Sequence, residues 1–554
     1  MENQRLFLYA SLGFVMLLLW QAWQADYAPR PTPQNQAATN QQPQVNNASK
    51  NDSAGDLPQV QVTQTSETTP ETTEKKPLET HTPIHVITDT FEILIQPKGG
   101  TLTSVKLQQY PAERDNPKEG FALMTPDGPH FFVAQSGLQS VSGPEAPSHH
   151  QIFETPQTDY RMEATEDELR VPLTWTGPDG LRVTKTYIFK RNSHLINLEN
   201  SITNTSEQPW QGRQYNQLQR AREERGSFFM AASYIGGVIY TEEEGYEKID
   251  FDEMRESNLE RPSTGGWIAM IQHYFLGAWI PGQEENTTFY SKALTSANRY
   301  IIGMYSTPLT IAPGETKALT AELYAGPKIQ SDLEEIAKGL DLTVDFGLLT
   351  VIAKPLFIVL DFIHSWVGNW GFAIIILTML IKLIFYKLSE TSYRSMARMR
   401  KLSPKLQALK EKYGNDRQKM GTATMELYKK EKVNPLGGCF PILIQIPVFI
   451  ALYWVLLESV ELRQAPFILW IQDLSVLDPY YVLPIIMGVT MFIQQKLNPA
   501  PIDPVQAKVF MILPVAFSFF FAFFPSGLVL YWVVNNTLSI AQQYYITRHV
   551  LAEK

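Results

Sequence analysis

The sequence predicts a multidomain membrane protein in which an α-helical transmembrane core of six spans carries a large all-β domain. Three observations predict this fold class. Apolar runs that are long enough for a bilayer occur near the start of the chain and again from about residue 346 onward. Between them, residues 83–328 alternate apolar and polar side chains with a period of two. One apolar run, 370–389, carries Lys382 within its own hydrocarbon stretch.

Composition excludes several functional classes. The chain has 554 residues, which leaves room for two or three domains, and a formal net charge of -9. Its one cysteine, Cys439, excludes an internal disulfide framework. Of nine histidines only His149 and His150 adjoin, and no HExxH, Cys/His or glycine-rich phosphate-binding motif occurs. We therefore expect no metal, no cofactor and no nucleotide-driven step.

The first apolar run, LFLYASLGFVMLLLWQAW at 6–23, predicts an uncleaved transmembrane anchor over 1–25. A cleavable signal peptide is the alternative. The anchor is favoured because the run is long, ends in Trp20 and Trp23, and has no small-x-small cleavage site directly after it.

The next two regions predict a tether and a β domain. Residues 26–82 are rich in Pro, Gln, Asn, Thr and Ser, which predicts a disordered tether because such a segment buries too little apolar surface. In 83–328, stretches such as LRVTKTYIFKR alternate apolar and polar residues, and Gly, Pro and Asn turns separate one stretch from the next. This pattern predicts an antiparallel sandwich of many strands. Its carboxylates and histidines are scattered, which favours a solvated surface over a sugar or peptide site.

Residues 329–368 predict a short linker helix followed by an amphipathic helix. The polar residues of the second helix fall within roughly 100° at 3.6 residues per turn; they are Thr350, Lys354, Asp361, His364 and Ser365. Such a wide apolar surface is typical of a helix that lies in the membrane interface. A true span is the alternative, but it would bury Lys354 and Asp361.

The second transmembrane helix is predicted over 369–389. Helical spacing places four polar residues on one face of it, and these are Thr378, Lys382, Tyr386 and Ser389. An ionisable side chain at membrane depth is expected to face protein or water. The alternative is that Lys382 extends to the cytoplasmic headgroups and serves only as an anchor.

Residues 390–435 predict a cytoplasmic helical hairpin. Apolar residues recur at three- and four-residue steps, and they include Met396, Met399, Leu402 and Leu406. Lys and Arg far outnumber Asp and Glu here, and the positive-inside rule places such a segment in the cytoplasm. That rule makes a nucleic-acid-binding arm unnecessary, so we expect no specific nucleic acid; contact with a ribosome or with anionic lipid is a secondary option.

Residues 436–547 hold four more apolar segments, which predict transmembrane helices 3 to 6, and 548–554 form a short cytoplasmic tail. With the hairpin inside, both termini are cytoplasmic and the β domain is external. Polar residues of the last helix share an arc of roughly 140°; they are Tyr531, Trp532, Asn535, Asn536, Ser539, Gln542 and Gln543. Gln445 lies between two prolines of the third span. Because lipid-facing amides are unfavourable, we expect a groove, wet from the cytoplasm, that contains Lys382.

Three stretches carry a resemblance to a known family: VNPLGGCFPILIQIPVF and its continuation to Phe492, NWGFAIII at 369–376, and FPSGLVLYWVVNN at 524–536. Through them the chain resembles the YidC/Oxa/Alb family of membrane protein insertases, densely over 346–547 and more loosely over the β domain. The resemblance implies a five-helix core with a positively charged hydrophilic groove, an interfacial amphipathic helix, a mobile hairpin and a periplasmic β-supersandwich.

The resemblance also implies the function and the partners. It implies a non-enzymatic insertase and chaperone of the bacterial inner membrane that acts on nascent membrane proteins, alone or with the Sec translocon. The phospholipid bilayer is a partner, and the ribosome and the signal recognition particle system are further candidates. Lys382 stands where the family usually has arginine, so the charge is kept but the bidentate geometry of arginine is lost. Tyr531-Trp532 stands in place of the family's tyrosine pair, which keeps the aromatic contact but removes a hydroxyl, and the short tail lacks the basic ribosome-binding extension of some relatives.

Two other functional classes remain as alternatives. A secondary transporter would also combine an intramembrane charge with broken helices, but it predicts inverted repeats, which the two halves do not share. A sugar-binding or sugar-active domain on a membrane anchor predicts a cleft with paired acid and base groups.

Overall fold

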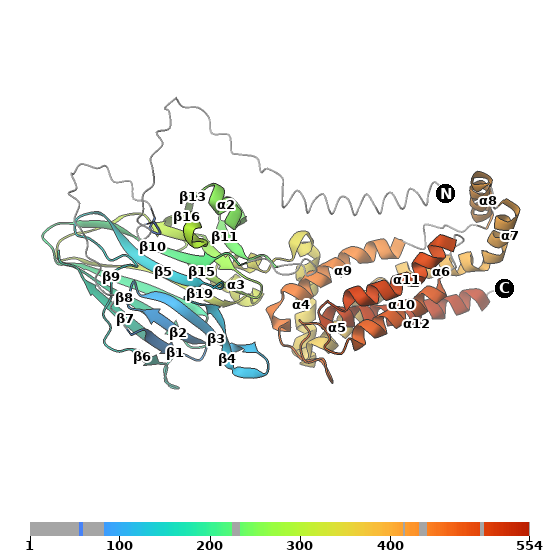
Figure 1. Cartoon of the computed structure of the whole chain (residues 1–554), viewed down its shortest axis with the longest axis horizontal. Coiled ribbons are helices and arrows are strands. Elements are labelled where there is room, and N and C mark those ends of the chain that lie inside the picture. Colours follow the sequence, from blue (N-terminus) through green and yellow to red (C-terminus); the bar gives the residue numbers. More distant parts are fainter. Residues whose placement is uncertain are drawn as a thin grey trace, which may run out of the picture.

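The structure, a computed structural model, describes residues 55–58, 82–223, 233–413, 416–431, 440–498 and 504–552. The predicted anchor over 1–25 and nearly all of the predicted tether lie outside the described residues. The described residues form a β-rich part and a helical part, which lie side by side in Figure 1.

The β-rich part consists of two sheets within residues 84–327. The first sheet runs in the order β13 (Glu260–Thr264), β16 (Asn286–Leu294), β17 (Arg299–Ser306), β10 (Trp210–Ala221), β5 (Phe132–Ser142), β3 (Thr101–Glu113), β2 (Phe91–Gln96), β1 (Ile84–Ile87) and β6 (Asp159–Arg161), with β4 (Asn116–Met124) beside β3 and β18 (Leu309–Ile311) beside β10. The second runs β12 (Gly245–Ile249), β11 (Gly236–Thr241), β14 (Trp267–Ile271), β15 (Phe275–Ile280), β19 (Thr316–Pro327), β9 (Leu195–Asn204), β8 (Leu181–Lys190) and β7 (Glu168–Thr176).

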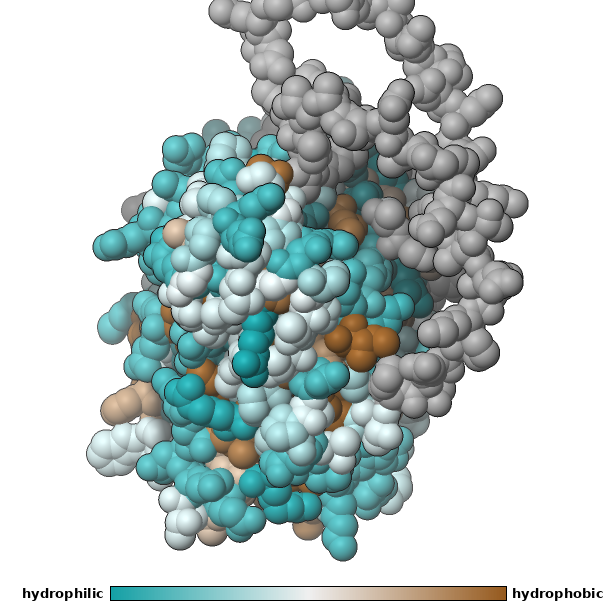
Figure 2. All heavy atoms as spheres, turned by 90° about the vertical axis from the view of Figure 1, so that its left-hand side faces the viewer, coloured by the Kyte–Doolittle hydropathy of each residue, from teal (hydrophilic) through white to brown (hydrophobic). Residues whose placement is uncertain are grey.

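Strand neighbours pair antiparallel except β1 and β6, which pair in parallel. The two sheets share one apolar core, in which the Phe91 ring of the first sheet lies 6.4 Å from the Phe189 ring of the second. The side chains of a strand point alternately to its two faces, which explains this packing. In β2 every second side chain is buried in the core, while the side chains between them are half-buried. The end of this part that faces away from the helices is covered mainly by hydrophilic residues (Figure 2).

Two short helices, α2 (Phe251–Glu256) and α3 (Gln330–Ile336), accompany the β-rich part. The helical part then contains α4 (Thr350–Val367), α5 (Trp370–Ile384), α6 (Tyr386–Lys401), α7 (Ser403–Tyr413), α8 (Arg417–Lys430), α9 (Phe440–Glu458), α10 (Val482–Leu497), α11 (Pro504–Phe521) and α12 (Ser526–Ala552). Figure 1 places α7 and α8 at the end of the helical part that is farthest from the sheets.

Among the described helices, one is long and apolar enough on its own to cross a bilayer, namely α4, and the pair α5 and α6 passes only if the two are taken together. Shorter apolar helices cover 445–458, 482–497 and 508–521. The polar residues that mark α12 lower its hydropathy, although it has 27 residues. Length and composition of the described helices therefore do not by themselves establish the six predicted spans.

The structure breaks the single helix that the sequence predicts over 369–389. Asn369 caps α5 by accepting a hydrogen bond from the backbone N–H of Phe372 at 3.1 Å, but α5 ends at Ile384. The next helix, α6, starts at Tyr386 and is bent by 68° from α5. The expected polar face is divided by this bend, because Tyr386 and Ser389 belong to α6.

The amphipathic helix α4 buries one face and exposes the other. Ala353, Phe357, Leu360 and Ile363, which recur at three- and four-residue steps, are buried against the neighbouring helices. The Trp366 side of the helix is exposed, with that residue 80 % accessible. One polar residue of α4 is paired with the preceding segment, since Lys354 Nζ lies 3.0 Å from Asp341 Oδ2.

A buried polar cluster joins the β-rich part to the helical part. Lys328, just after β19, lies with its Nζ 3.5 Å from Oε2 of Glu458 at the end of α9. Ser233 donates to Oε1 of the same carboxylate at 2.7 Å, and the ring of His273 binds the Leu457 carbonyl at 2.8 Å. The side chains of Lys328 and Glu458 are 2 % and 4 % exposed, so this contact is a desolvated one.

A second carboxylate at this junction, that of the half-buried Glu461, is expected to make stability depend on pH. Burial raises the pKa of Glu461 from 4.5 to about 7, and its Oε2 atom has no hydrogen-bond partner among the described residues. Because the unfolded carboxyl ionises first, the free energy of unfolding falls as the pH rises from about 4.5 to 7, by up to about 3 kcal/mol. We expect Glu461→Gln to abolish this fall when denaturation is followed at several pH values. An unchanged pH dependence would contradict the assignment.

Candidate functional site

Lys382 points toward the last helix. Its Nζ donates a hydrogen bond to Oγ of Ser539 on α12 at 2.8 Å. The Ser539 hydroxyl in turn donates to the backbone carbonyl of Asn535, one turn earlier, at 2.7 Å. The lysine side chain is half-buried, so its charge lies between α5 and α12 and does not extend along α5 toward Lys387.

A row of polar side chains on α12 continues from this contact in both directions. On one side, Gln445 of α9 donates to Oδ1 of Asn535 at 2.6 Å. On the other, Gln542 donates to the carbonyl of Tyr386 at 3.2 Å, at the bend that separates α5 from α6. Asn535, Ser539 and Gln542 are spaced four and three residues apart, which places them on one face of the helix. We call these three residues, with Lys382 and Gln445, the polar row.

Asn536 does not belong to the polar row. Its amide Nδ2 lies 3.4 Å from the hydroxyl of Thr490 on α10, and the side chain is 3 % exposed. Gln543, seven residues later, lies on the same face and donates to Asn498 at 2.9 Å. The single polar arc that the sequence predicts on the last helix is therefore divided between two neighbours, α5 with α9 on one side and α10 on the other.

The predicted aromatic pair packs against α9. The Tyr531 ring is stacked with Phe449 at 6.0 Å, and the Trp532 ring meets the same phenylalanine edge to face at 5.0 Å. The indole Nε1 of Trp532 is buried and has no hydrogen-bond partner among the described residues. Thr378, one turn before Lys382, is buried and donates to the Ile374 carbonyl of its own helix at 2.6 Å, so its hydroxyl is already satisfied.

The predicted hairpin residues form two classes. Leu402 and Leu406 are buried, whereas Met396 and Met399 are half-buried on α6. The helices α7 and α8 pack against each other and are joined by an ion pair between Lys405 and Glu431 at 2.6 Å. These four side chains are apolar and supply no hydrogen bond to the polar row.

The partners that α10 supplies, Thr490 and Asn498, are not among the site residues predicted from the sequence. Thr490 and Asn498 each receive an amide from α12, and both are polar residues in or beside an apolar helix. That signal was available in the sequence, because a buried polar group in an apolar helix is expected to need a partner on a neighbouring helix.

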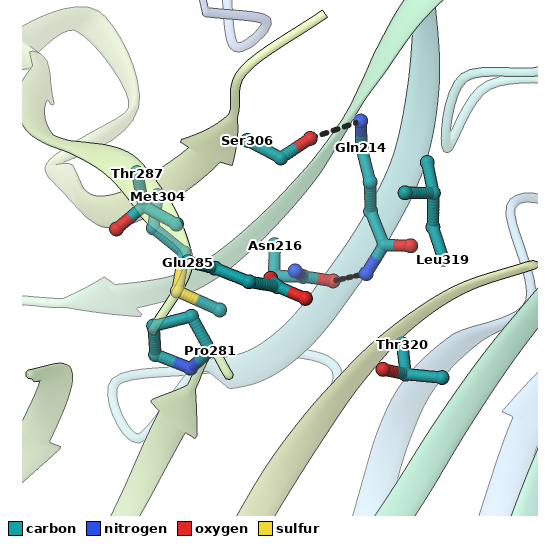
Figure 3. Close-up of a pocket in the computed structure, with 9 residues that line it drawn as sticks. All are labelled: Gln214, Asn216, Pro281, Glu285, Thr287, Met304, Ser306, Leu319 and Thr320. Atoms are coloured by element: carbon teal, nitrogen blue, oxygen red, sulfur yellow. Dashed lines mark hydrogen bonds between the residues drawn. The ribbon is translucent and has the colours of Figure 1, made fainter. Parts of the chain in front are cut away.

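A small hollow in the β-rich part bears on the sugar-site alternative. It lies among β10, β16, β17 and β19 and is lined by Gln214, Asn216, Glu285 and Ser306, with other residues (Figure 3). Its volume of about 20 Å³ is enough for about one water molecule and too small for a sugar. Gln214 donates to Oδ1 of Asn216 at 3.3 Å, so these amides bind each other.

A larger apolar groove of about 390 Å³ lies between α10 and α11. Its lining includes Gly488 and Ser518, which are small enough to leave a gap between the two helices, and it is otherwise almost entirely apolar. No predicted site residue lines it. No residue of the polar row lines the groove, so the two are separate.

Solved structures that are similar to this chain include an active YidC insertase crystal structure with the first transmembrane domain resolved. It is 19% identical, covers 84% of this chain and 93% of its own, and has a TM-score of 0.38. A galactose mutarotase-like protein from Lactobacillus casei matches 44% of this chain and 99% of its own at 9% identity, with a TM-score of 0.28. Both structural similarities are weak.

Sequence comparisons are far stronger. The family model described as the YidC periplasmic domain matches residues 83–359, and the model described as the 60Kd inner membrane protein matches 362–553. Proteins named membrane protein insertase YidC from Nitrosococcus oceani and Methylococcus capsulatus are 51% and 52% identical, over 100% and 99% of both chains. One from Thioalkalivibrio sulfidiphilus is 53% identical over 99% of both. The chain therefore belongs to the YidC family of membrane protein insertases.

Proposed function

We propose that this chain inserts membrane proteins by receiving the polar flank of a nascent segment at the polar row. The observation that carries the proposal is the inward direction of Lys382, whose ammonium lies 2.8 Å from Ser539 on the last helix. An ammonium that is held between helices, and not among headgroups, can attract an acidic peptide in a medium of lower dielectric than water. The unpartnered indole N–H of Trp532 supports the proposal, because a buried donor of this kind favours water or a bound peptide carbonyl.

The energetics of this mechanism require no nucleotide. The flank of the substrate is polar, so leaving water is unfavourable unless other polar groups replace its hydration. The amides, hydroxyl and ammonium of the polar row supply such groups. The apolar segment of the substrate then moves into lipid beside α9 and α12, where burial of apolar surface contributes roughly 25 cal/mol per Å². That transfer drives release from the row.

The proposed topology has six spans, formed by the anchor over 1–25, by α5, and by α9, α10, α11 and α12. In this arrangement α4 lies in the outer interface, and the tether and residues 83–328 are periplasmic. The Lys- and Arg-rich hairpin is cytoplasmic, since such segments remain on that side. The opposite ends that the sheets and the α7–α8 pair occupy in Figure 1 support this assignment. Both termini are then cytoplasmic, in a bacterial inner membrane.

The proposed substrates are nascent membrane proteins, and the proposed activity is insertion and folding assistance, not catalysis of a chemical reaction. The Sec translocon is a proposed partner for some substrates, and the ribosome and signal recognition particle system are proposed to deliver them. The hairpin supports delivery from the cytoplasm, because it presents a cationic surface with half-buried methionines, Met396 and Met399.

Site-specific photocrosslinking tests the proposed path directly. A photoreactive amino acid at Gln445 or Trp532 is expected to crosslink to a stalled nascent membrane protein, because Gln445 belongs to the polar row and Trp532 lies one turn before Asn535 on α12. The matched control is Phe519, on the exposed side of α11, which is expected to give little or no product. Equal yields at all three positions, or none at Gln445 and Trp532, would contradict the proposed path.

A further inference from the structure

A short piece of the tether docks onto the β-rich part beside the adjoining histidines. Asp56 lies in the described segment 55–58, which is 93 residues from His149 in sequence. Its Oδ2 atom is 3.0 Å from Nε2 of His149, and its Oδ1 atom is 3.0 Å from Nε2 of His150. One ligand atom from each of the three residues lies within 4.8 Å of the others. No part of the insertion mechanism uses this cluster.

The two imidazoles are held in place by the β-rich part. The backbone N–H and Nδ1 of His149 lie 2.9 and 2.6 Å from the hydroxyl of Tyr215, which is itself fully buried on β10. The turn that carries both histidines is fixed by Ser148, whose hydroxyl donates to Gln151 at 2.6 Å. Gly99 has a φ of +75°, and a Cβ there would approach the His149 backbone to 2.4 Å, so only glycine fits beside the turn.

The tether segment has contacts of its own besides those of the histidines. Gln139 donates to the carbonyl of Pro58 at 2.8 Å, and Lys292 lies 3.4 Å from the carbonyl of Leu57. Pro58 is buried. These contacts hold the backbone of 55–58 against the β-rich part and so place Asp56 beside the histidines. Its side chain is only 14% exposed. A carboxylate that is fixed in this way has lost most of its freedom before any ligand arrives.

We propose that Asp56, His149 and His150 form a binding site for a divalent transition metal of the zinc class, which fastens the tether to the β-rich part. Two imidazole nitrogens and one carboxylate, with a water molecule in the fourth position, are a ligand set that Zn²⁺ favours. Bonds of about 2.0–2.2 Å in a tetrahedron require ligand atoms roughly 3.4 Å apart. The two 3.0 Å contacts involve different oxygens of Asp56, and one ligand atom from each residue lies within 4.8 Å of the others, so metal binding requires only a small rearrangement of these side chains.

The groups around the site fit this role. With Nε2 on the metal, the Nδ1–H of His149 donates to the Tyr215 hydroxyl, and such a second contact orients a ligating histidine. The charges that oppose a cation are Lys292 and Lys185. Lys185 donates to the carbonyls of Gly99 and Ser136, and burial lowers its pKa to about 7. Both lysines become less charged as the pH rises, so metal affinity is expected to increase with pH.

Metal binding by the full chain in detergent micelles tests the proposal. Titration calorimetry with Zn²⁺ is expected to show one site per chain in the unaltered protein, and Co²⁺ is expected to give the visible bands of a tetrahedral complex. Asp56→Asn keeps the shape of the side chain but removes its charge, and it should weaken binding by at least about tenfold, as even outer-shell changes do. The matched control, His130→Ala, removes an imidazole that is 72% exposed, and should leave binding unchanged.

A second measurement links metal to tether. Hydrogen exchange at 55–58 and 148–151 is expected to slow on addition of Zn²⁺ in the unaltered protein and in His130→Ala, and to stay constant in Asp56→Asn. Insertion activity should persist in Asp56→Asn. Loss of metal binding can therefore be distinguished from loss of insertion through the polar row. Absence of Zn²⁺ binding in the unaltered protein, or equal binding by Asp56→Asn, would overturn the proposal.

Discussion

Lys382→Ala is expected to lower insertion of substrates with an acidic translocated flank by about tenfold, while substrates with a neutral flank are affected far less. The reason is electrostatic: the ammonium lies between α5 and α12, where an opposite charge interacts more strongly than in water. A loss of about 1.4 kcal/mol in stabilisation of the crossing flank corresponds to about tenfold in rate. A protease-protection assay with paired substrates, which differ only in the charge of the flank, measures the effect.

The matched control for this prediction is Lys387→Ala. It removes the same charge five residues away, from a side chain that is 90% exposed, and it should leave both substrates unaffected. Lys382→Arg should retain most of the activity, because it keeps the positive charge and adds hydrogen-bond donors. Equal losses for acidic and neutral flanks in Lys382→Ala would reduce this residue to a structural one.

Lys328→Met is expected to destabilise the junction between the β-rich and helical parts by about 3–5 kcal/mol, because it leaves the Glu458 carboxylate buried without its cation. Burial lowers the pKa of Lys328 below its usual value, and the neighbouring Glu458 offsets part of this fall, so the charged lysine depends on its carboxylate partner. The two side chains are almost fully buried, so solvent does not screen the loss. Chemical denaturation in micelles, combined with hydrogen exchange at 457–463, measures both the size and the location of the effect.

The double variant Lys328→Met with Glu458→Gln separates charge from packing. It removes the unpaired carboxylate while a glutamine oxygen can still accept from Ser233, which binds Glu458 at 2.7 Å. We expect it to recover most of the stability, since replacing both partners of a buried pair is often close to neutral. A double variant as unstable as Lys328→Met would show that the ion pair is not the cause.

Much of the helical site could be predicted from residue pattern alone. Lys382, Gln445 and Asn535 were identified because a polar group in an apolar helix needs a polar neighbour. The pattern could not show the 68° bend after Ile384, since no proline or glycine marks it. It also could not show that Asn536 turns to Thr490, because a helical arc of 140° is wide enough to face two neighbours.

In the β-rich part, too, the local elements could be predicted from the sequence, whereas contacts between residues far apart in the chain could not. Period-two alternation predicts its strands, because alternate side chains of a strand point to opposite faces. The contact of Asp56 with His149 joins residues that are 93 positions apart, and the pair of Lys328 with Glu458 joins the two parts of the chain. Contacts of this kind depend on how the finished sheets and helices pack, and no short sequence motif encodes them.

The central claim, that the polar row is reached by water from the cytoplasm, is tested most directly by cysteine labelling. In a Cys439→Ser background, Asn535→Cys and Gln542→Cys, which replace half-buried members of the polar row, are exposed to a membrane-impermeant thiol reagent in inverted and in right-side-out vesicles. Asn536→Cys, which faces α10, serves as the matched control on the same helix. We expect rapid labelling of the first two in inverted vesicles only, and slow labelling of the control. Protection of Asn535→Cys and Gln542→Cys in both orientations would contradict the claim.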